Sequence, residues 1–301
     1  MNSFKELEKN MQTPSHIGLK FILAVFTIAG LLSGSTVSAD QDIPARVVSL
    51  SPIITETIYL VGAQDSLIAD TTYCNVPEPA KFKEKIGSVT QMNVEKIIRL
   101  RPDLVIASSL SREKQLMILE HQSIRVFRAQ NPKTFSQMCD MTLTIGQKLG
   151  KEENAGQIVE QAQKEAAAIL KKIRDLKKPR VFLQIGLKPL HSANKEMFIN
   201  EYIRYGGGIN IAENESSGIY SREKVIKQNP DIILISTMGS SKKAGELEKQ
   251  GWMIFKTINA VKNNRIFVLD PEMICSPTPT TFITGLKTVL PLIHPEITFD
   301  E

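Results

Sequence analysis

The chain of 301 residues carries 37 lysine and arginine residues against 32 aspartate and glutamate residues, a formal net charge of +5. Hydrophobic residues make up 42% and charged residues 23%, which excludes a disordered tail or a low-complexity chain. The positive charges are spread along the chain and only 6% of residues are aromatic. Nucleic-acid binding is therefore disfavoured, because it needs clustered basic residues with stacking rings.

The N-terminal segment predicts export. Lys20 precedes the apolar run 21–32, and small residues follow, as in a secretory signal peptide. Twelve apolar residues span about 18 Å as a helix, too short for the roughly 30 Å hydrocarbon core of a bilayer. We expect residues 1–39 to be cleaved off, with Met1 or Met11 as the start. No cysteine follows the apolar run, so we expect a soluble periplasmic protein without a lipid anchor.

The remaining chain alternates short β-branched runs with helical stretches, which is typical of parallel α/β sheets. In chain order the first part predicts strands at 46–50, 103–107 and 124–127 and helices at 112–121 and 134–149. After Pro179 it predicts strands at 180–185, 231–236 and 265–269 and a last helix at 280–293.

Between these two parts, apolar residues recur every three or four positions over 152–176. A helix of about 25 residues makes a rod of about 37 Å. We therefore expect an α/β fold of two lobes, 40–150 and 179–301, each with a central, mainly parallel sheet. The segment 151–178 would join them as one long rigid helix, and a ligand cleft would lie between the lobes, where open α/β sheets bind ligands.

A repeat supports two lobes of similar build. The segment 93–108 (NVEKIIRLRPDLVIAS) matches 221–236 (SREKVIKQNPDIILIS) without a gap, at an offset of 128 residues. Six residues face identical partners, namely Glu95, Lys96, Ile98, Pro102, Asp103 and Ser108 against Glu223, Lys224, Ile226, Pro230, Asp231 and Ser236. The alternative is chance, because a helix followed by Pro-Asp and a strand is a frequent α/β turn.

Three cysteines, Cys74, Cys139 and Cys275, follow the predicted signal peptide. An odd number leaves at least one thiol free in an oxidising compartment, and the spacing matches no disulfide framework or zinc motif. Cys139 falls in a helical pattern and is predicted to be a core residue. A Cys74–Cys275 bond and two separate thiols both stay open.

Several segments together resemble one family. RVVSLSPIITE, TTYCNVPEPAK, QMNVEKIIRLRPDLVIAS, RVFLQIG, YSREKVIKQNPDIILIS and the terminal LIHPE occur in the order of periplasmic substrate-binding proteins with a rigid helical backbone. These proteins serve ABC importers of vitamin B12, haem and ferric siderophores. The phrases MNVEKI, RPDLVIA, RVFLQ and SREKVI are most similar to the vitamin B12-binding members. The resemblance implies a monomer that binds a metal chelate and has no intrinsic cofactor.

Glu95 and Glu223 lie in the first turn of two short predicted helices. A carboxylate there gains about 0.3 to 1 kcal/mol from the helix dipole, so helix stabilisation alone could account for both. One such glutamate on each lobe could also meet a two-fold-symmetric partner. The resemblance implies that role, because in this family one glutamate per lobe docks onto a homodimeric ABC permease with its ATPase subunits.

The ligand-binding positions depart from the cobalamin binders, which hold their ligand with aromatic rings. Tyr73 is retained, but Val89, Ile185, Ser217 and Met273 stand where rings are expected. His191 also replaces a ring, and Thr280 lies near an expected arginine. Lost rings remove stacking worth about 0.5 to 1.5 kcal/mol each. A corrinoid therefore stays the first ligand class, with haem or a ferric siderophore next.

Soft, coordinating side chains accompany these changes. They are Tyr73, Cys74, Met92, His191, Met273 and Cys275, all in segments expected to border the cleft. Tyr73 and His191 are the candidate metal ligands. Each also has a simpler interpretation, since loop histidines, packing methionines and lid tyrosines are common. Trp252 could pack under the second lobe or line the cleft.

Enzyme motifs are missing from the sequence. It contains no G-x-S-x-G, P-loop or G-x-G-x-x-G pattern, and the run 206–208 of three glycines follows a helical stretch as a stop. The alternative kept open is a secreted two-lobed enzyme acting on a metal tetrapyrrole, such as a chelatase, with His191 as base or ligand. Binding without turnover would favour transport instead.

Overall fold

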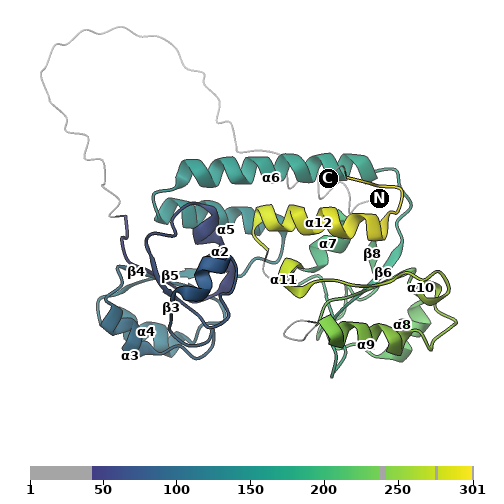
Figure 1. Ribbon diagram of the computed structural model, residues 1–301, viewed down its shortest axis with the longest axis horizontal. Coiled ribbons are helices and arrows are strands. Elements are labelled where there is room, and N and C mark those ends of the chain that lie inside the picture. Colours follow the sequence, from purple (N-terminus) through teal and green to yellow (C-terminus); the bar gives the residue numbers. More distant parts are fainter. Residues whose placement is uncertain (1–42, 238–241, 275–276, 300–301) are drawn as a thin grey trace, which may run out of the picture.

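The structure is a computed structural model that describes residues 43–237, 242–274 and 277–299 (Figure 1). Two α/β lobes lie side by side, and the long helix α6 (Glu152–Ile173) runs over both of them along one side (Figure 1). This arrangement confirms the predicted fold class of two lobes with mainly parallel sheets. The residue boundaries proposed for the lobes stay a prediction.

The first lobe is built on a five-stranded parallel sheet with the order β3-β2-β1-β4-β5. Its strands are β1 (Val47–Ser49), β2 (Leu67–Asp70), β3 (Glu84–Lys85), β4 (Leu104–Ser108) and β5 (Arg125–Ala129). Val47 and Val48 are both fully buried, in apolar clusters on opposite faces of the sheet. A strand buried on both faces reads as a continuous apolar run, which is why β1 and β4 were visible in the sequence.

Helices cover both faces of this sheet, and most connect one strand to the next. They are α2 (Pro52–Leu60), the 3-10 helix η1 (Glu78–Phe82), α3 (Val94–Leu100), α4 (Glu113–His121) and α5 (Phe135–Lys148). Pro52 starts α2 at its first position, and Gly62 follows its end with φ of +77°. Ser51 occupies the N-cap position of α2, but its side chain makes no capping hydrogen bond.

The second lobe has a sheet with the order β10-β9-β6-β7, and β8 also pairs with β6. Its strands are β6 (Arg180–Gly186), β7 (His191–Ser192), β8 (Ile209–Asn210), β9 (Ile232–Ile235) and β10 (Ile266–Val268). Only β7 runs antiparallel to its neighbour. The helices of this half are α7 (Asn200–Tyr205), α8 (Arg222–Gln228), α9 (Lys242–Trp252), α10 (Asn259–Lys262), α11 (Pro271–Ile274) and α12 (Pro279–Ile293).

The predicted rod is α6 (Glu152–Ile173), and it does not stand alone. It packs against both α5 and α12, as Figure 1 shows along the top of the molecule. One apolar cluster holds residues of α5, α6, α7, α12 and β6 together. The connection between the lobes is therefore a layer of packed helices, which resists bending better than a single helix does.

Phe282 of α12 lies at the centre of this layer. Its ring is fully buried, 5.0 Å from the Phe135 ring of α5 and 4.8 Å from the Tyr202 ring of α7. We expect Phe282→Ala to lower the free energy of unfolding by about 3 to 5 kcal/mol, because it opens a cavity where both halves meet. Urea denaturation measures the loss. Phe82→Ala is the control, since Phe82 is 84% exposed and its change should stay within about 0.5 kcal/mol.

Candidate ligand and docking sites

The sequence repeat is also a structural repeat. The side chain of Asn93 caps α3 by accepting a hydrogen bond from the Lys96 amide at 2.9 Å, and Ser221 caps α8 in the same way through the Lys224 amide at 3.2 Å. Both helices have seven residues and end on a left-handed residue with φ of 46° or 47°. Side-chain caps at the start and left-handed residues at the end fix the length of each helix.

The aspartates of the repeat bind matching groups in the two lobes. Asp103 Oδ2 accepts from the Arg46 amide at 2.8 Å, and Asp231 Oδ2 accepts from the Arg180 amide at 2.9 Å. The Arg46 and Arg180 guanidinium groups donate to backbone carbonyls at the ends of α3 and α8, at 2.7 and 2.9 Å. Each short helix is thus fixed to the first residues of a central strand by the same contacts.

Glu95 and Glu223 occupy the second position of α3 and α8, and both are exposed. Figure 1 shows α3 and α8 on the same side of the molecule, opposite α6. The neighbouring Lys96 and Lys224 pair with other glutamates, and within the described residues no ion pair is made by Glu95 or Glu223. Hydrogen bonds from its own amide and from the Ser221 hydroxyl lower the pKa of Glu223. Both carboxylates are exposed, on helices that lie on the same side of the molecule.

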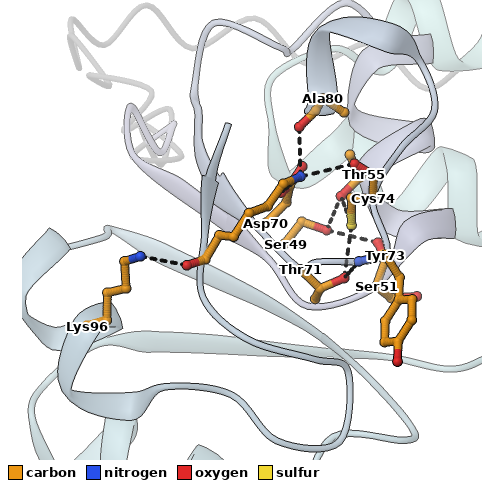
Figure 2. Close-up of polar contacts among 10 residues, drawn as sticks. Ser49, Ser51, Thr55, Asp70, Thr71, Tyr73, Cys74, Ala80 and Lys96 are labelled. Carbon is orange, nitrogen blue, oxygen red and sulfur yellow. Dashed lines mark hydrogen bonds and ion pairs between the residues drawn. The ribbon is translucent and has the colours of Figure 1, made fainter. Parts of the chain in front are cut away.

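Tyr73 follows the carboxyl end of β2, where open α/β sheets bind ligands. Its side chain is 63% exposed, and Figure 2 shows the ring pointing away from the buried polar groups beneath it. Those groups fix the loop that carries it. Lys85 Nζ donates to Asp70 Oδ1 at 2.7 Å, to the Cys74 carbonyl at 3.1 Å and to the Ala80 carbonyl at 2.9 Å. Burial raises the pKa of Asp70 despite this ion pair.

The Cys74 thiol points into the lobe. Thr55 Oγ1 donates to Cys74 Sγ at 3.2 Å, and the Thr71 hydroxyl lies at the same distance (Figure 2). The residue is fully buried, and desolvation raises the pKa of its thiol. Cys74 and Cys139 are both free thiols, and Cys275 lies outside the described residues. The Cys74 thiol therefore packs against two threonine hydroxyls inside the first lobe, and its burial speaks against direct ligand contact.

The other predicted ligand contacts differ in exposure. Met92 and Ile185 are buried in the cores of the two lobes, at 5% and 7% exposure. Val89 is half-buried and Ser217 is exposed. Met273 on α11 is partly buried against the apolar cluster that holds α5, α6, α7, α12 and β6 together. Burial speaks against direct ligand contact for Met92 and Ile185. Val89, Ser217 and Met273 keep accessible surface.

His191 begins β7, which follows the carboxyl end of β6 after the turn 187–190, and is half-buried. A Cβ built at Gly186 would lie 3.0 Å from the His191 Cβ, so the glycine allows the two strands to approach closely. The chain also returns beside it, since Ile219 forms a bridge with His191. Tyr73 and His191 thus follow strand ends of different lobes. No group of three or more histidine, cysteine or acidic side chains suited to a metal ion occurs in the described ranges.

A buried network that the sequence did not predict joins β6 to α8. Trp252 Nε1 donates to Gln184 Oε1 at 2.8 Å, and Gln184 Nε2 donates to Glu248 Oε1 at 2.9 Å. Glu248 also pairs with Arg222, whose guanidinium lies 4.4 Å from the centre of the Trp252 ring. Trp252 is fully buried in the second lobe, which settles its role as a core residue. The network fixes the first residue of α8, next to Glu223.

A cavity of about 690 Å³ lies where the first lobe meets the start of α12. Its lining comes from α2, from Gln64 and Asp65 just after it, from the loop 76–83 and from two threonines of the second half, Thr278 and Thr281. Glu56 of α2 lines it, and burial raises the pKa of this carboxyl to about 8. None of the predicted ligand residues lines this cavity. Only packing between distant segments creates it.

We expect Glu56→Gln to stabilise the protein increasingly as the pH rises from about 5 to 8. The pKa of Glu56 is higher in the folded state than in the unfolded state, so between these two values the folded state holds a proton that the unfolded state has lost. The free energy of unfolding of the wild type therefore falls as the pH rises over this range, whereas that of Glu56→Gln does not. Above pH 8 the gain in the free energy of unfolding should reach about 1 to 2 kcal/mol. This is less than the full pKa shift corresponds to, because the cavity is open to solvent, which screens the charge. Urea denaturation at pH 5, 7 and 9 tests this. A gain independent of pH would contradict it.

The comparisons with known proteins agree with this architecture. A family model described as "Periplasmic binding protein" matches residues 47–273. The chain belongs to this family. A vitamin B12-binding protein of Vibrio vulnificus is 28% identical over 264 residues, covering 85% of this chain and 93% of its own. The periplasmic haem-binding protein HutB of Vibrio cholerae has the same fold, with a TM-score of 0.74 and 21% identity over 83% of this chain and 99% of its own.

A further relative corrects one prediction. An ABC transporter substrate-binding lipoprotein of Bacillus subtilis, YvrC, is 31% identical over 277 residues, covering 88% of this chain and 86% of its own. The expectation that the protein has no lipid anchor was wrong, because it rested on the residues around the apolar run 21–32, while the likeness extends to a lipoprotein. The expected location outside the cytoplasm agrees with this relative. The predicted signal peptide lies outside the described residues. Within the described part, no helix is long and apolar enough to cross a membrane.

Proposed function

We propose that this periplasmic binding protein captures a metal chelate between its lobes and delivers it to an ABC permease. A corrinoid is the first ligand class, with haem or a ferric siderophore next. The B12-binding relative supports the corrinoid, since it matches 85% of the chain. Tyr73 supports it as well, because an exposed ring on a fixed loop offers a stacking surface. The protein acts as a monomer and has no intrinsic cofactor.

The structural repeat is the observation that carries the delivery step. It gives each lobe one exposed glutamate in the same local frame, on the side of the molecule opposite α6. A two-fold-symmetric partner presents the same surface twice, so two equivalent acidic contacts match a homodimeric permease with its ATPase subunits. Charge pairs at such an interface chiefly fix its register and its association rate.

Incubation with candidate ligands tests the capture step. The protein is mixed separately with cyanocobalamin, cobinamide, haemin and a ferric siderophore, passed through gel filtration, and its visible spectrum recorded. We expect the corrin band to elute with the protein. A Soret shift with haemin that is lost in His191→Ala but kept in His121→Ala would instead assign haem, with His191 as the axial ligand. Loss of all four ligands on the column would contradict the proposal.

Tyr73→Ala provides the residue-level test. Loss of one stacking contact costs about 0.5 to 1.5 kcal/mol, so we expect corrinoid binding to weaken by up to about tenfold. Isothermal titration calorimetry measures the change. Phe82→Ala, which removes another exposed ring from the same loop region, is the matched control and should leave the affinity unchanged. Equal affinity of Tyr73→Ala and the wild type would remove Tyr73 from the ligand site.

A further inference from the structure

The cavity beside α2 contains polar groups that the fold does not satisfy. Glu56 makes no hydrogen bond or ion pair with any other residue in the described part of the chain. The hydroxyl of Tyr59, one turn further along α2, is buried and has no hydrogen-bond partner. Of the two, only the Tyr59 hydroxyl is a fully buried atom, whereas Glu56 is half-buried and keeps access to the cavity. Buried polar groups are nearly always paired in folded proteins, and an acidic side chain without a partner beside them leaves room for a ligand that carries a donor.

The rest of the cavity is suited to a small organic molecule. Leu60, Val76, Pro77 and Pro79 provide apolar surface, and a volume of about 690 Å³ falls within the range of small-molecule sites, about 300 to 1,000 Å³. The Thr278 and Thr281 hydroxyls are occupied, because together they cap the start of α12. The Thr278 amide donates to Thr281 Oγ1, and the Thr281 amide donates to Thr278 Oγ1. The cavity groups without a partner therefore lie on the side of the first lobe.

The charges around the cavity favour a cation. The lining contains two acidic residues, Glu56 and Asp65, and one basic residue, Lys83. The Lys83 ammonium group donates a hydrogen bond to the Gln64 carbonyl at 3.1 Å. No described cation offsets the Glu56 carboxyl, whose pKa is raised by burial alone. A bound ammonium group would supply the missing charge and hydrogen-bond donors, and so favour the ionised carboxylate.

We propose that this cavity is a second binding site, separate from the chelate site, for a small organic cation with an apolar body. Its ammonium group lies against the Glu56 carboxyl and its apolar part lies against the loop 76–79. The ligand contacts both halves of the molecule, because Thr278 and Thr281 close the cavity from the side of α12. The proposal does not depend on which chelate the protein transports.

Binding of 2-phenylethylamine to the whole protein tests the site by calorimetry at pH 7, with 2-phenylethanol and 3-phenylpropanoate as neutral and anionic analogues. We expect the amine to bind at least tenfold more tightly than either analogue. Titrations in two buffers of different ionisation enthalpy should show net release of protons on amine binding, since a carboxyl with a pKa of about 8 is mostly protonated at pH 7. Equal binding of the amine and the alcohol would overturn the proposal.

Four variants test whether the amine binds at Glu56 in this cavity. Glu56→Gln should weaken amine binding at least tenfold and remove proton release, whereas Glu160→Gln, an exposed glutamate on α6, should change neither. Val76→Trp fills the cavity from a residue that is 37% exposed, and should block binding without unfolding the protein. Tyr73→Ala should leave amine binding intact. Unchanged binding in Glu56→Gln, or loss of binding in Tyr73→Ala, would contradict a separate site.

Discussion

Reversal of both docking charges, Glu95→Lys with Glu223→Lys, is expected to reduce chelate uptake at least about 100-fold while chelate affinity stays unchanged. Each lost ion pair at an interface costs at least about 1.4 kcal/mol, a factor of ten, and two new like-charge contacts add to that loss. Both glutamates are exposed and lie outside the lobe cores, so the folded state should tolerate the change. Uptake is measured with radiolabelled cyanocobalamin, or with whichever chelate the spectra identify.

The control reverses two charges on the opposite side of the molecule. Glu160 on α6 and Asp175, just after it, are exposed, and Glu160→Lys with Asp175→Lys changes the net charge by the same amount. This variant should support normal uptake. Since the two lobes would contact equivalent permease subunits, each single reversal should give a similar partial defect. Normal uptake by the double docking variant, or loss of chelate affinity in it, would refute the assignment.

Lys85→Met is expected to destabilise the protein by about 3 kcal/mol at pH 7. Asp70 is fully buried and its Oδ2 already has no hydrogen-bond partner, so loss of Lys85 leaves a buried carboxylate without its ion pair and with only the weaker attraction of Lys83. The Cys74 and Ala80 carbonyls lose their donor as well. The destabilisation should shrink as the pH falls toward 4, because protonation removes the buried charge. Urea denaturation at pH 4 and pH 7 measures both effects.

Two further variants separate charge from packing. Lys83→Met removes a neighbouring lysine that attracts Asp70 without an ion pair and donates to the Gln64 carbonyl, and should cost less than about 1 kcal/mol. Asp70→Asn combined with Lys85→Met removes both charges and should recover part of the stability lost in the single variant. Chelate binding by Lys85→Met should also weaken, since Lys85 fixes the loop that carries Tyr73. A cost equal to that of Lys83→Met would show that the ion pair is not structural.

The sequence located the elements whose signals are local. The period of apolar residues over 152–176 predicted α6, which extends from Glu152 to Ile173. The last helix, predicted at 280–293, is α12 from Pro279 to Ile293. Short elements such as β7 and β8, each of two residues, were missed because two residues carry no measurable period. The repeat at 128 residues predicted two short helices of similar build, α3 and α8, since the residues that start and end a helix lie within one turn of its ends.

What the sequence determined by itself was the order of strands and helices, the two-lobed class and the pair of equivalent glutamates. The tertiary structure alone decided which side chains are accessible. It buried Cys74, Met92 and Ile185, made Trp252 part of a core network, and created the cavity at Glu56 from segments more than 200 residues apart. The physical reason is that burial and pKa depend on neighbours brought together by packing, whereas helix periods, caps and turns depend on neighbours along the chain.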